Sequence, residues 1–501
     1  MDHRPSPDDS KSGGGDQGRY PRIGSLRGVD AFRDHLAAFA PELGVDDEIL
    51  AADRSPLALP MDVAGITVGN RWAIQPMEGW DGTAEGGPGE LTLRRWRHFG
   101  ESGAKLIWGG EAVAVQKDGR ANPNQLVLAE ATMKGFEELR ETLLRAHVER
   151  FASADDLLLG LQLTHSGRFA RPRRKDRPEP RVAYRHPILD DRVNVRDDAA
   201  VLTDREVDGL IEDFVEAARR ARDLGFRFVD VKHCHGYLLH EFLGAHTRPG
   251  PYGGSFDNRT RVLRQIVAGI RRDAPGLEIG VRVSIFDVVP YRPDPARTEG
   301  SLLGPGIPED HAHCLPYRFG FGVDPDDPTR PDLHEGRELL ELFRRLGIRL
   351  VNLSGGSPYY NPHVQRPALY PPSDGYRPPE DPMAGVVRHL QITRELKRDF
   401  PDLLLVGSAL SYLQEYLPHV AQSLVRDGWM DSVGIGRMIL SYWDLPADTL
   451  EKGTLERRRI CRTFSDCTTA PRGGLVSGCY PLDPHYGALS AAERLRAIKR
   501  G

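Results

Sequence analysis

The chain has 501 residues, of which 39% are hydrophobic and 28% charged, and its formal net charge is −5. This composition is typical of a soluble globular protein, and so small a charge gives no electrostatic reason to expect nucleic acid or an anionic membrane as a partner. No apolar run is long enough to span a bilayer, and the N-terminus lacks the apolar core of a signal peptide. Because five cysteines in so long a chain do not suggest a disulfide framework, we expect a reducing, cytoplasmic location.

The composition divides the chain into four parts. Residues 1–25 are polar and rich in Gly, Pro and Asp, which predicts a disordered tail. Residues 26–59 are interpreted as an N-terminal extension, and residues 451–501 as a C-terminal extension of helices and loops. The main domain is expected between them, over residues 60–450.

Short apolar runs predict eight buried strands in the main domain. They are Trp72–Ile74, Leu106–Trp108, Leu157–Leu163, Phe228–Val231, Ile279–Val283, Leu350–Leu353, Leu403–Val406 and Ser432–Ile435. Helical patterns lie between most of them, and the clearest covers Asp204–Leu224, after a capping box at Thr203–Glu206. Strands that alternate with helices in this way predict an α/β fold, a (β/α)8 TIM barrel. An open doubly wound sheet is the alternative, but no G-x-G-x-x-G segment follows a strand.

Three long segments interrupt this alternation. They are Arg168–Ala200, Ser284–His334 and Asn361–Pro382, and each follows a predicted strand. Loops of this length inside a compact domain are usually lids or binding loops. We therefore expect all three on the catalytic face of the barrel.

The densest group of proton-handling residues follows the fourth strand, Phe228–Val231. Lys232, His233, His235 and Tyr237 all lie within six consecutive positions there. In a parallel barrel these residues lie at the carboxyl end of a strand, where such barrels place their chemistry. A solvated strand end would explain one histidine, but it explains this combination less well.

Several motifs occur in a fixed order between Pro60 and Asp483. They are Asn70-Arg71, Gln75-Pro76-Met77, Glu111–Val115 with Gly119-Arg120, Leu161–Arg168, His235–Leu243, Tyr252–Ser255 with Asn258-Arg259, Val281–Ser284 and Gly434–Arg437. Together they resemble the old yellow enzyme family of FMN-dependent oxidoreductases, in the branch of 2,4-dienoyl-CoA reductase and trimethylamine dehydrogenase. The resemblance implies a (β/α)8 barrel, in agreement with the strand count, with FMN as the cofactor and NADH or NADPH as the electron donor.

The resemblance also assigns residues to the flavin ring, which needs apolar contacts and hydrogen bonds at its pyrimidine edge. Pro76, Met77 and Ala112 are expected beside the ring, and Gln162 at the pyrimidine edge. Arg282 would stabilise the negative charge that the reduced ring carries near its N1–C2=O region. The alternatives are a satisfied strand-end amide for Gln162 and an ion pair with a neighbouring strand for Arg282.

The phosphate of the cofactor is expected after strands seven and eight. Gly407-Ser408 and Gly436-Arg437 stand there, where barrels often bind phosphate through backbone N–H groups and a helix N-terminus. Glycine allows close approach of the backbone, and Arg437 adds a bidentate partner.

Two positions depart from the family pattern. Lys232-x-x-His235 replaces the H-x-x-H or H-x-x-N pair that holds the substrate's carbonyl oxygen in relatives. Glu78, also assigned to the cofactor site, stands where relatives often have Thr or Cys beside the flavin. A buried carboxylate is costly unless it is paired, so Glu78 is expected either to pair with Lys232 or to point away.

The resemblance implies that hydride passes from NAD(P)H through flavin N5 to an activated C=C bond of a small molecule. His235 and Lys232 would polarise the substrate's carbonyl group, and Tyr237 would protonate its α-carbon. The redox alternative is dehydrogenation of an amine or another C–H substrate. A Schiff-base aldolase that uses Lys232, or a flavin-binding protein without turnover, is a more remote alternative. A homo-oligomer is left open.

Three cysteines, Cys461, Cys467 and Cys479, follow the eighth strand. Members of the resembled branch with an iron–sulfur cluster carry four cysteines there, and Phe464 takes the place of one of them. Because a [4Fe–4S] cluster normally takes four thiolates, we predict no cluster and no other metal. The cysteines are interpreted as small buried hydrophobic residues.

Overall fold

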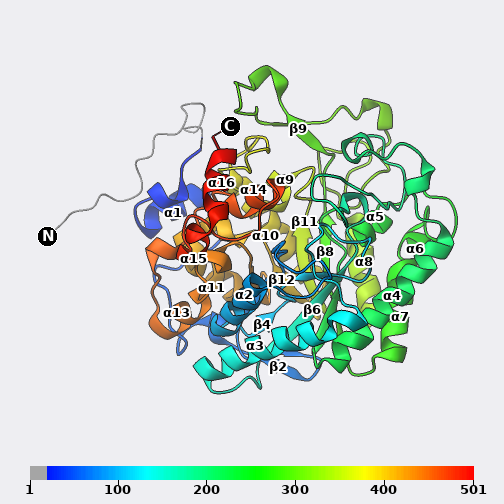
Figure 1. Cartoon of the computed structure of the whole chain (residues 1–501). Coiled ribbons are helices and arrows are strands. Elements are labelled where there is room, and N and C mark those ends of the chain that lie inside the picture. Colours follow the sequence, from blue (N-terminus) through cyan, green and yellow to red (C-terminus); the bar gives the residue numbers. More distant parts are fainter. Residues whose placement is uncertain (1–19, 501) are drawn as a thin grey trace.

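The computed structural model describes residues 20–500, and its centre is a closed ring of parallel strands (Figure 1). Each strand pairs in parallel with the next, and the last, β13, pairs with the first, β3. The ring consists of β3 (Trp72–Ile74), β4 (Leu106–Ile107), β6 (Leu158–Thr164), β7 (Phe228–Val231), β8 (Glu278–Phe286), β11 (Leu350–Gly355), β12 (Leu404–Gly407) and β13 (Ser432–Ile435). The predicted (β/α)8 barrel is confirmed.

The second strand of the barrel is broken into two pieces. After β4 the chain turns at Gly109 (φ 131°) and Gly110 (φ 53°), and it pairs with β6 again as β5 (Ala112–Ala114). A Cβ atom at Gly109 would lie 2.6 Å from the backbone nitrogen of Gln162, so only glycine fits this approach. The single predicted run Leu106–Trp108 missed the second piece.

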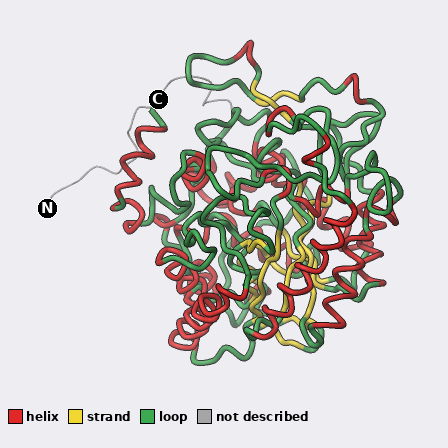
Figure 2. Tube along the Cα trace, turned by 45° about the vertical axis from the view of Figure 1, so that its right-hand side comes forward, coloured by secondary structure: helices red, strands yellow, loops and turns green. Residues whose placement is uncertain are grey.

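Helices cover the outside of the ring (Figures 1 and 2). The capping box predicted for α4 is present, because Thr203 Oγ1 accepts from the Glu206 amide and Glu206 Oε2 accepts from the Thr203 amide. The larger helices are α2 (Glu90–Glu101), α3 (Met133–Phe151), α4 (Asp204–Asp223), α7 (Arg261–Asp273), α8 (His334–Arg345), α10 (Pro382–Asp399) and α11 (Leu417–Arg426). Shorter ones are α5 (Leu238–Leu243), α6 (Phe256–Arg259), α9 (Pro362–Gln365), α12 (Met438–Ser441) and α13 (Leu445–Lys452).

An antiparallel hairpin closes the amino-terminal end of the barrel. Its strands, β1 (Met61–Val63) and β2 (Ile66–Val68), contribute buried side chains to one hydrophobic cluster with Trp108, Phe228 and Leu350 from the barrel strands. This end is therefore filled with apolar side chains, which leaves the carboxyl ends of the strands for polar chemistry.

The predicted long segments differ in how much regular structure they contain. Strand β8 continues to Phe286, so the segment predicted from Ser284 begins too early. This segment also contains an antiparallel hairpin of β9 (Tyr291–Pro293) and β10 (Gly306–Pro308), which projects at the top of Figure 1. Arg192, from the segment after β6, donates to the carbonyl oxygen of Tyr291 at 2.9 Å. The two segments thus lie against each other.

Short helices flank the barrel at both ends of the chain. Near the N-terminus, α1 (Gly28–Ala37) places Phe32 in a stack with Tyr416, with ring centroids 4.3 Å apart. The predicted tail over residues 1–25 falls mostly outside the described residues, but Ile23–Ser25 form a 3-10 turn with Ile23 fully buried. The C-terminal extension contains α14 (Asp466–Arg472), α15 (Pro484–Ala488) and α16 (Ser490–Ile498).

Across residues 20–500, no helix combines the length and the apolar character that crossing a membrane requires.

Candidate active site

A buried carboxylate, Asp230, ties together the strands under the site. It lies in β7 and accepts hydrogen bonds from Trp108 Nε1 (2.7 Å), Gln162 Nε2 (2.6 Å) and the backbone nitrogen of Arg282 (2.7 Å). Burial raises the pKa of Asp230, whereas these donors oppose the rise. Sequence reasoning missed this role, although an acidic residue inside an apolar strand was the signal for it. One N–H of Gln162 is thus committed to Asp230, and the rest of its amide remains for a ligand.

Arg282 places a buried positive charge in the middle of β8. Its side chain is only 6% exposed, burial lowers its pKa, and its Nε has no hydrogen-bond partner within the described chain. A buried N–H without a partner costs free energy, so the position favours a ligand that accepts a hydrogen bond. This geometry fits the predicted edge of a flavin.

A second concentration of positive charge lies at the end of β13. Arg437 donates to the carbonyl oxygen of Pro367 at 3.0 Å through Nη2, while its Nη1 is buried without a partner in residues 20–500. Arg366, which the sequence did not indicate, bonds to Thr468 through Nη1 and likewise leaves a buried Nη2 unpartnered. Burial and the nearby charges of Arg437 and Arg472 lower the pKa of Arg366 to about 9. Two buried guanidinium groups that each keep an unpartnered N–H favour the binding of an anionic ligand.

The backbone beside these arginines is open to a ligand. A Cβ atom added at Gly436 would meet no atom closer than 3.9 Å, so the chain leaves room there. Ser408 is held from the other side, since Gln75 Nε2 donates to its Oγ at 3.2 Å and to the Gly407 carbonyl oxygen at 3.3 Å. The helix after β13, α12, has only four residues. The predicted contribution of a helix N-terminus is therefore weak, and the arginine side chains carry most of the charge.

The residues predicted beside the flavin ring come from neighbouring strands. Pro76 and Met77 follow β3, where the Met77 amide donates to the Gly110 carbonyl oxygen at 3.2 Å. Ala112 is buried at the start of β5, and its carbonyl oxygen accepts from Gln125 Nε2. The structure thus brings these residues to one side of the barrel, but their contact with a flavin stays a prediction.

His235 is presented by a strained turn. Its φ of 67° is unusual for a residue other than glycine, and Gly236 follows with a φ of 76°. Its backbone amide donates to Ser284 Oγ at 3.0 Å, and its Nε2 lies 2.9 Å from Ser354 Oγ. Burial, with the charges of Arg282 and Lys232, lowers the pKa of His235 well below its ordinary value. The ring is therefore neutral at pH 7 and can donate only through one tautomer.

Lys232 and Glu78 face each other, which is one of the two arrangements expected from the sequence. Lys232 Nζ lies 3.8 Å from Glu78 Oε1 and 3.8 Å from the centre of the Tyr237 ring. Burial lowers the pKa of Lys232 and raises that of Glu78, while their mutual attraction opposes both shifts. His233 turns away and places its Nδ1 2.7 Å from the Val231 carbonyl oxygen.

Tyr237 and a second tyrosine complete this group. The Tyr237 hydroxyl donates to Glu78 Oε1 at 2.8 Å and lies 2.9 Å from the hydroxyl of Tyr359. Tyr359 follows β11 and stacks on Phe169, with ring centroids 4.0 Å apart. Nothing local in the sequence marked Tyr359, because it stands between a strand and a Pro-rich segment.

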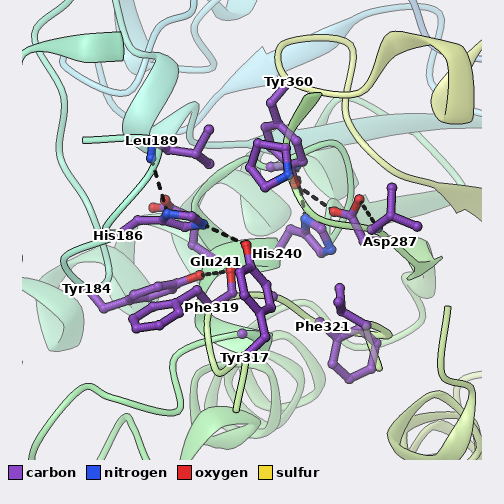
Figure 3. A pocket seen from close by; sticks show the side chains of 16 residues that line it. Tyr184, His186, Leu189, His240, Glu241, Asp287, Tyr317, Phe319, Phe321 and Tyr360 are labelled. Atoms are coloured by element: carbon purple, nitrogen blue, oxygen red, sulfur yellow. Dashed lines mark hydrogen bonds between the residues drawn. The ribbon is translucent and has the colours of Figure 1, made fainter. Parts of the chain in front are cut away.

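Figure 3 shows a small cavity of about 30 Å³, which is lined by Tyr184, His186, Asp287, Tyr317 and Tyr360 among others. Gly236 lines it, and several of its polar groups bond to one another: Tyr360 donates to Asp287 at 2.7 Å, and the hydroxyl of Tyr317 lies 3.4 Å from His186 Nε2. His240 Nε2, also in the lining, has no hydrogen-bond partner within residues 20–500. Its volume suits one or two water molecules. We therefore regard it as support for the His235 turn rather than a substrate site.

The three C-terminal cysteines lie around another small cavity, of about 20 Å³, with Arg437 and Phe464 in its wall. Cys479 is buried, but Cys461 and Cys467 are only partly buried, so the interpretation of all three as buried hydrophobic residues is wrong for two of them. Phe464, which the resemblance places where a fourth cysteine would stand, lies in the wall of this cavity. The absence of an iron–sulfur cluster stays a prediction.

The fold and these groups define a class of protein, (β/α)8 barrels with buried cations and a proton-handling cluster at the carboxyl ends of the strands. Residues 56–300 match the model of the NADH:flavin oxidoreductase / NADH oxidase family. The resemblance drawn from its motifs is confirmed.

Individual relatives match at moderate to low identity. The NADPH dehydrogenase of Halalkalibacterium halodurans is 31% identical over 215 residues, which cover 42% of this chain and 57% of the relative. A complex of 2-naphthoyl-CoA reductase superposes with a TM-score of 0.60 at 16% identity, over 86% of this chain and 57% of the other. An old yellow enzyme homologue from Zymomonas mobilis gives a TM-score of 0.52 at 18% identity, over 80% of this chain and 94% of its own.

Likeness to these proteins supports the resemblance and shows the fold. At such identities the two solved structures establish the fold alone. This chain spans less than two thirds of the length of the curated relatives that it matches. The activity of this protein is therefore inferred from its own residues.

Proposed function

We propose that this protein is an FMN-dependent oxidoreductase that passes hydride from NADH or NADPH to an electron-poor C=C bond of a small molecule. The observation that carries the proposal is the pair of buried, unpartnered guanidinium N–H groups on Arg282, within β8, and Arg437, after β13, in residues 20–500. FMN presents an anionic phosphate and a ring edge that becomes negative on reduction, which are the two partners these groups lack. The family match supports the same cofactor.

FMN, when bound, supplies the hydride-accepting and hydride-donating ring. Arg282 and Gln162 would hold its polar edge, and Arg437 with the backbone at Gly436 would hold its phosphate. Because Arg282 is buried, its charge is little screened and would stabilise negative charge on the ring strongly. Glu78 would act on the reaction through its hydrogen bond with Tyr237 rather than through contact with the flavin ring.

The substrate is held and protonated by the group at the end of β7. Lys232 and the neutral ring of His235 would donate to the substrate's carbonyl oxygen, which draws electron density from the β-carbon. Tyr237, whose pKa burial and Glu78 raise well above the ordinary value, keeps its proton at pH 7 and would deliver it to the α-carbon.

One observation argues against the amine alternative. The ammonium group of Lys232 already lies over the face of the Tyr237 ring, at 3.8 Å from its centre. This is the position in which an aromatic side chain would hold a cationic amine. A carbonyl compound, which gains from a positive donor, fits the occupied site better than a second cation does.

The test begins with purified protein and added FMN. We expect a yellow complex, bleaching of the flavin by NADH or NADPH without oxygen, and recovery of the colour when 2-cyclohexenone is added. A protein that takes up no FMN would overturn the proposal. A flavin that an amine reduces and an enone does not reoxidise would favour the amine alternative, and trapping of Lys232 by borohydride with a carbonyl compound would favour the aldolase.

We also propose a cytoplasmic location, in line with the expected reducing compartment. All five cysteines, which lie within the described part of the chain, are free.

A further inference from the structure

The hydroxyl group of Tyr237 has a single proton and two polar neighbours. It donates that proton to Glu78 Oε1 at 2.8 Å, and the Tyr359 hydroxyl lies 2.9 Å away. A proton engaged with a carboxylate points away from a substrate. The arrangement therefore limits Tyr237 as an acid for as long as Glu78 is ionised.

Protonation of Glu78 reverses the direction of this hydrogen bond. A carboxylic acid has its own O–H and can donate to the Tyr237 oxygen. The proton of Tyr237 is then free to leave toward a substrate. The protonation state of Glu78 thus decides whether Tyr237 can act.

Charged and titratable groups surround Glu78 on several elements. Lys232, after β7, stabilises its ionised form from 3.8 Å, and Cys234 and Tyr359 lie close enough to interact electrostatically. Behind it, the Gly79 amide donates to Glu111 Oε2 at 3.3 Å, and burial raises the pKa of Glu111 to about 8.

Arg95 fixes this second carboxylate. It bonds to Glu111 and also to Asp81, at 2.7 Å, so the loop that carries Glu78 is held at two points. The side chain of Glu78 is 14% exposed, which gives it access to water. The loop is therefore rigid, and its carboxylate can exchange a proton with solvent.

We propose that Glu78 stores the proton that reloads Tyr237 in each turnover, an inference that rests on the proposed function. The hydride comes from the reduced cofactor and forms the C–H bond at the β-carbon. In the same step the O–H bond of Tyr237 breaks as its proton forms the C–H bond at the α-carbon, and the carboxyl O–H bond of Glu78 breaks as its proton passes to the Tyr237 oxygen. The carboxylate that remains is stabilised by Lys232 and regains a proton from water.

Glu78 is thus a positioning residue that acts through Tyr237, and its signature is a pH dependence. The loaded form exists below the pKa of Glu78, so the rate of proton delivery falls as pH rises through that pKa, by about tenfold per unit. Two protons move together in a relay, whereas one moves from an isolated tyrosine. The rate in mixtures of H2O and D2O should therefore depend on the square of the deuterium fraction.

The experiment measures reoxidation of the reduced FMN complex by 2-cyclohexenone in stopped flow, for wild type, Glu78→Gln and Glu78→Asp. Glu78→Gln can still hydrogen-bond but carries no transferable proton. We expect it to lose the pH dependence, to show a linear isotope dependence, and to react about 10- to 100-fold more slowly. Glu78→Asp keeps a carboxyl group and should keep the pH dependence at a reduced rate.

The possible outcomes distinguish a failure of the proton relay from a failure of the proposed function. A Glu78→Gln complex with the wild-type rate, pH profile and isotope dependence would overturn the relay while the proposed function stands. A wild-type complex that 2-cyclohexenone does not reoxidise at any pH would overturn the proposed function, and the relay with it. If Glu78→Gln binds no FMN, Glu78→Asp decides, because loss of the pH dependence in a carboxyl variant contradicts the relay.

Discussion

The two sides of the site differ in how their charges are paired. Arg282 in β8 and Arg437 after β13 each keep a buried N–H without a partner in residues 20–500, and Arg366 adds a third. At the end of β7, Lys232 and Glu78 pair with each other instead. A buried cation without a partner is costly until a ligand supplies one, whereas a paired cluster holds its own protons. We infer that the first side is built for a resident anionic cofactor and the second for a substrate that comes and goes.

The largest expected effect lies on the paired side. Tyr237→Phe keeps the ring and removes the proton, so reoxidation of the reduced FMN complex by 2-cyclohexenone should slow by about 10² or more. Reduction by NAD(P)H, which needs no proton from Tyr237, should change little. Stopped-flow traces of the two half-reactions separate these effects.

Tyr359→Phe is the matched control for this variant. It removes the neighbouring hydroxyl but leaves Tyr237 bonded to Glu78, so its effect on reoxidation should be much smaller. Equal reoxidation rates in wild type and Tyr237→Phe would show that the proton comes from another group.

Substitutions on the unpaired side are expected to change the affinity of the protein for the cofactor. Arg437→Ala and Arg366→Ala each remove a charge-assisted partner of the phosphate, which we expect to weaken FMN by about 10- to 100-fold. Riboflavin lacks the phosphate, so its affinity should be nearly unchanged in both variants. Quenching of flavin fluorescence on titration with protein measures both ligands. An equal loss for FMN and riboflavin would place these arginines at the ring instead.

The barrel could be predicted because its strands are buried on both faces. Such strands appear as unbroken apolar runs, and Trp72–Ile74, Phe228–Val231 and Ser432–Ile435 match the structure at both ends. The short strand β5 was missed, since Ala112–Ala114 follows two glycines and carries little pattern of its own. The β9 and β10 hairpin was missed because its residues are mostly half-buried and do not alternate.

The site was predictable to the extent that its residues follow barrel strands. A position just after a strand points to the catalytic face, which places Lys232 and Arg437 without knowledge of the tertiary structure, whereas Arg282 lies within β8. Tyr359 and Arg366 belong to a Pro-rich connection whose path is set by packing against distant segments. No local pattern encodes that path, so their roles emerged only from the structure.

The smallest expected effect concerns His235. Its substitution tests how much this residue contributes to binding of a carbonyl oxygen on the paired side. Phenols mimic an enolate and should bind between Lys232 and His235. His235→Ala removes one neutral donor, so phenol affinity should fall by up to about tenfold, the scale of a single neutral hydrogen bond. Ser354→Ala removes only the partner at 2.9 Å that orients the ring, and its effect should be smaller still.

The pH dependence of phenol binding sharpens this last test. Because its surroundings hold the pKa of His235 well below the ordinary value, the ring does not gain a proton between about pH 6 and pH 8. The pH dependence of affinity should therefore come from the phenol and the Lys232–Glu78 pair and not from His235, and the curve should keep its shape in His235→Ala while it shifts downward. Spectral titration of the bound flavin at several pH values measures this. An additional step near pH 6.5 that His235→Ala abolishes would mean that the imidazole is protonated in the site, and that Lys232 and Arg282 do not suppress its charge.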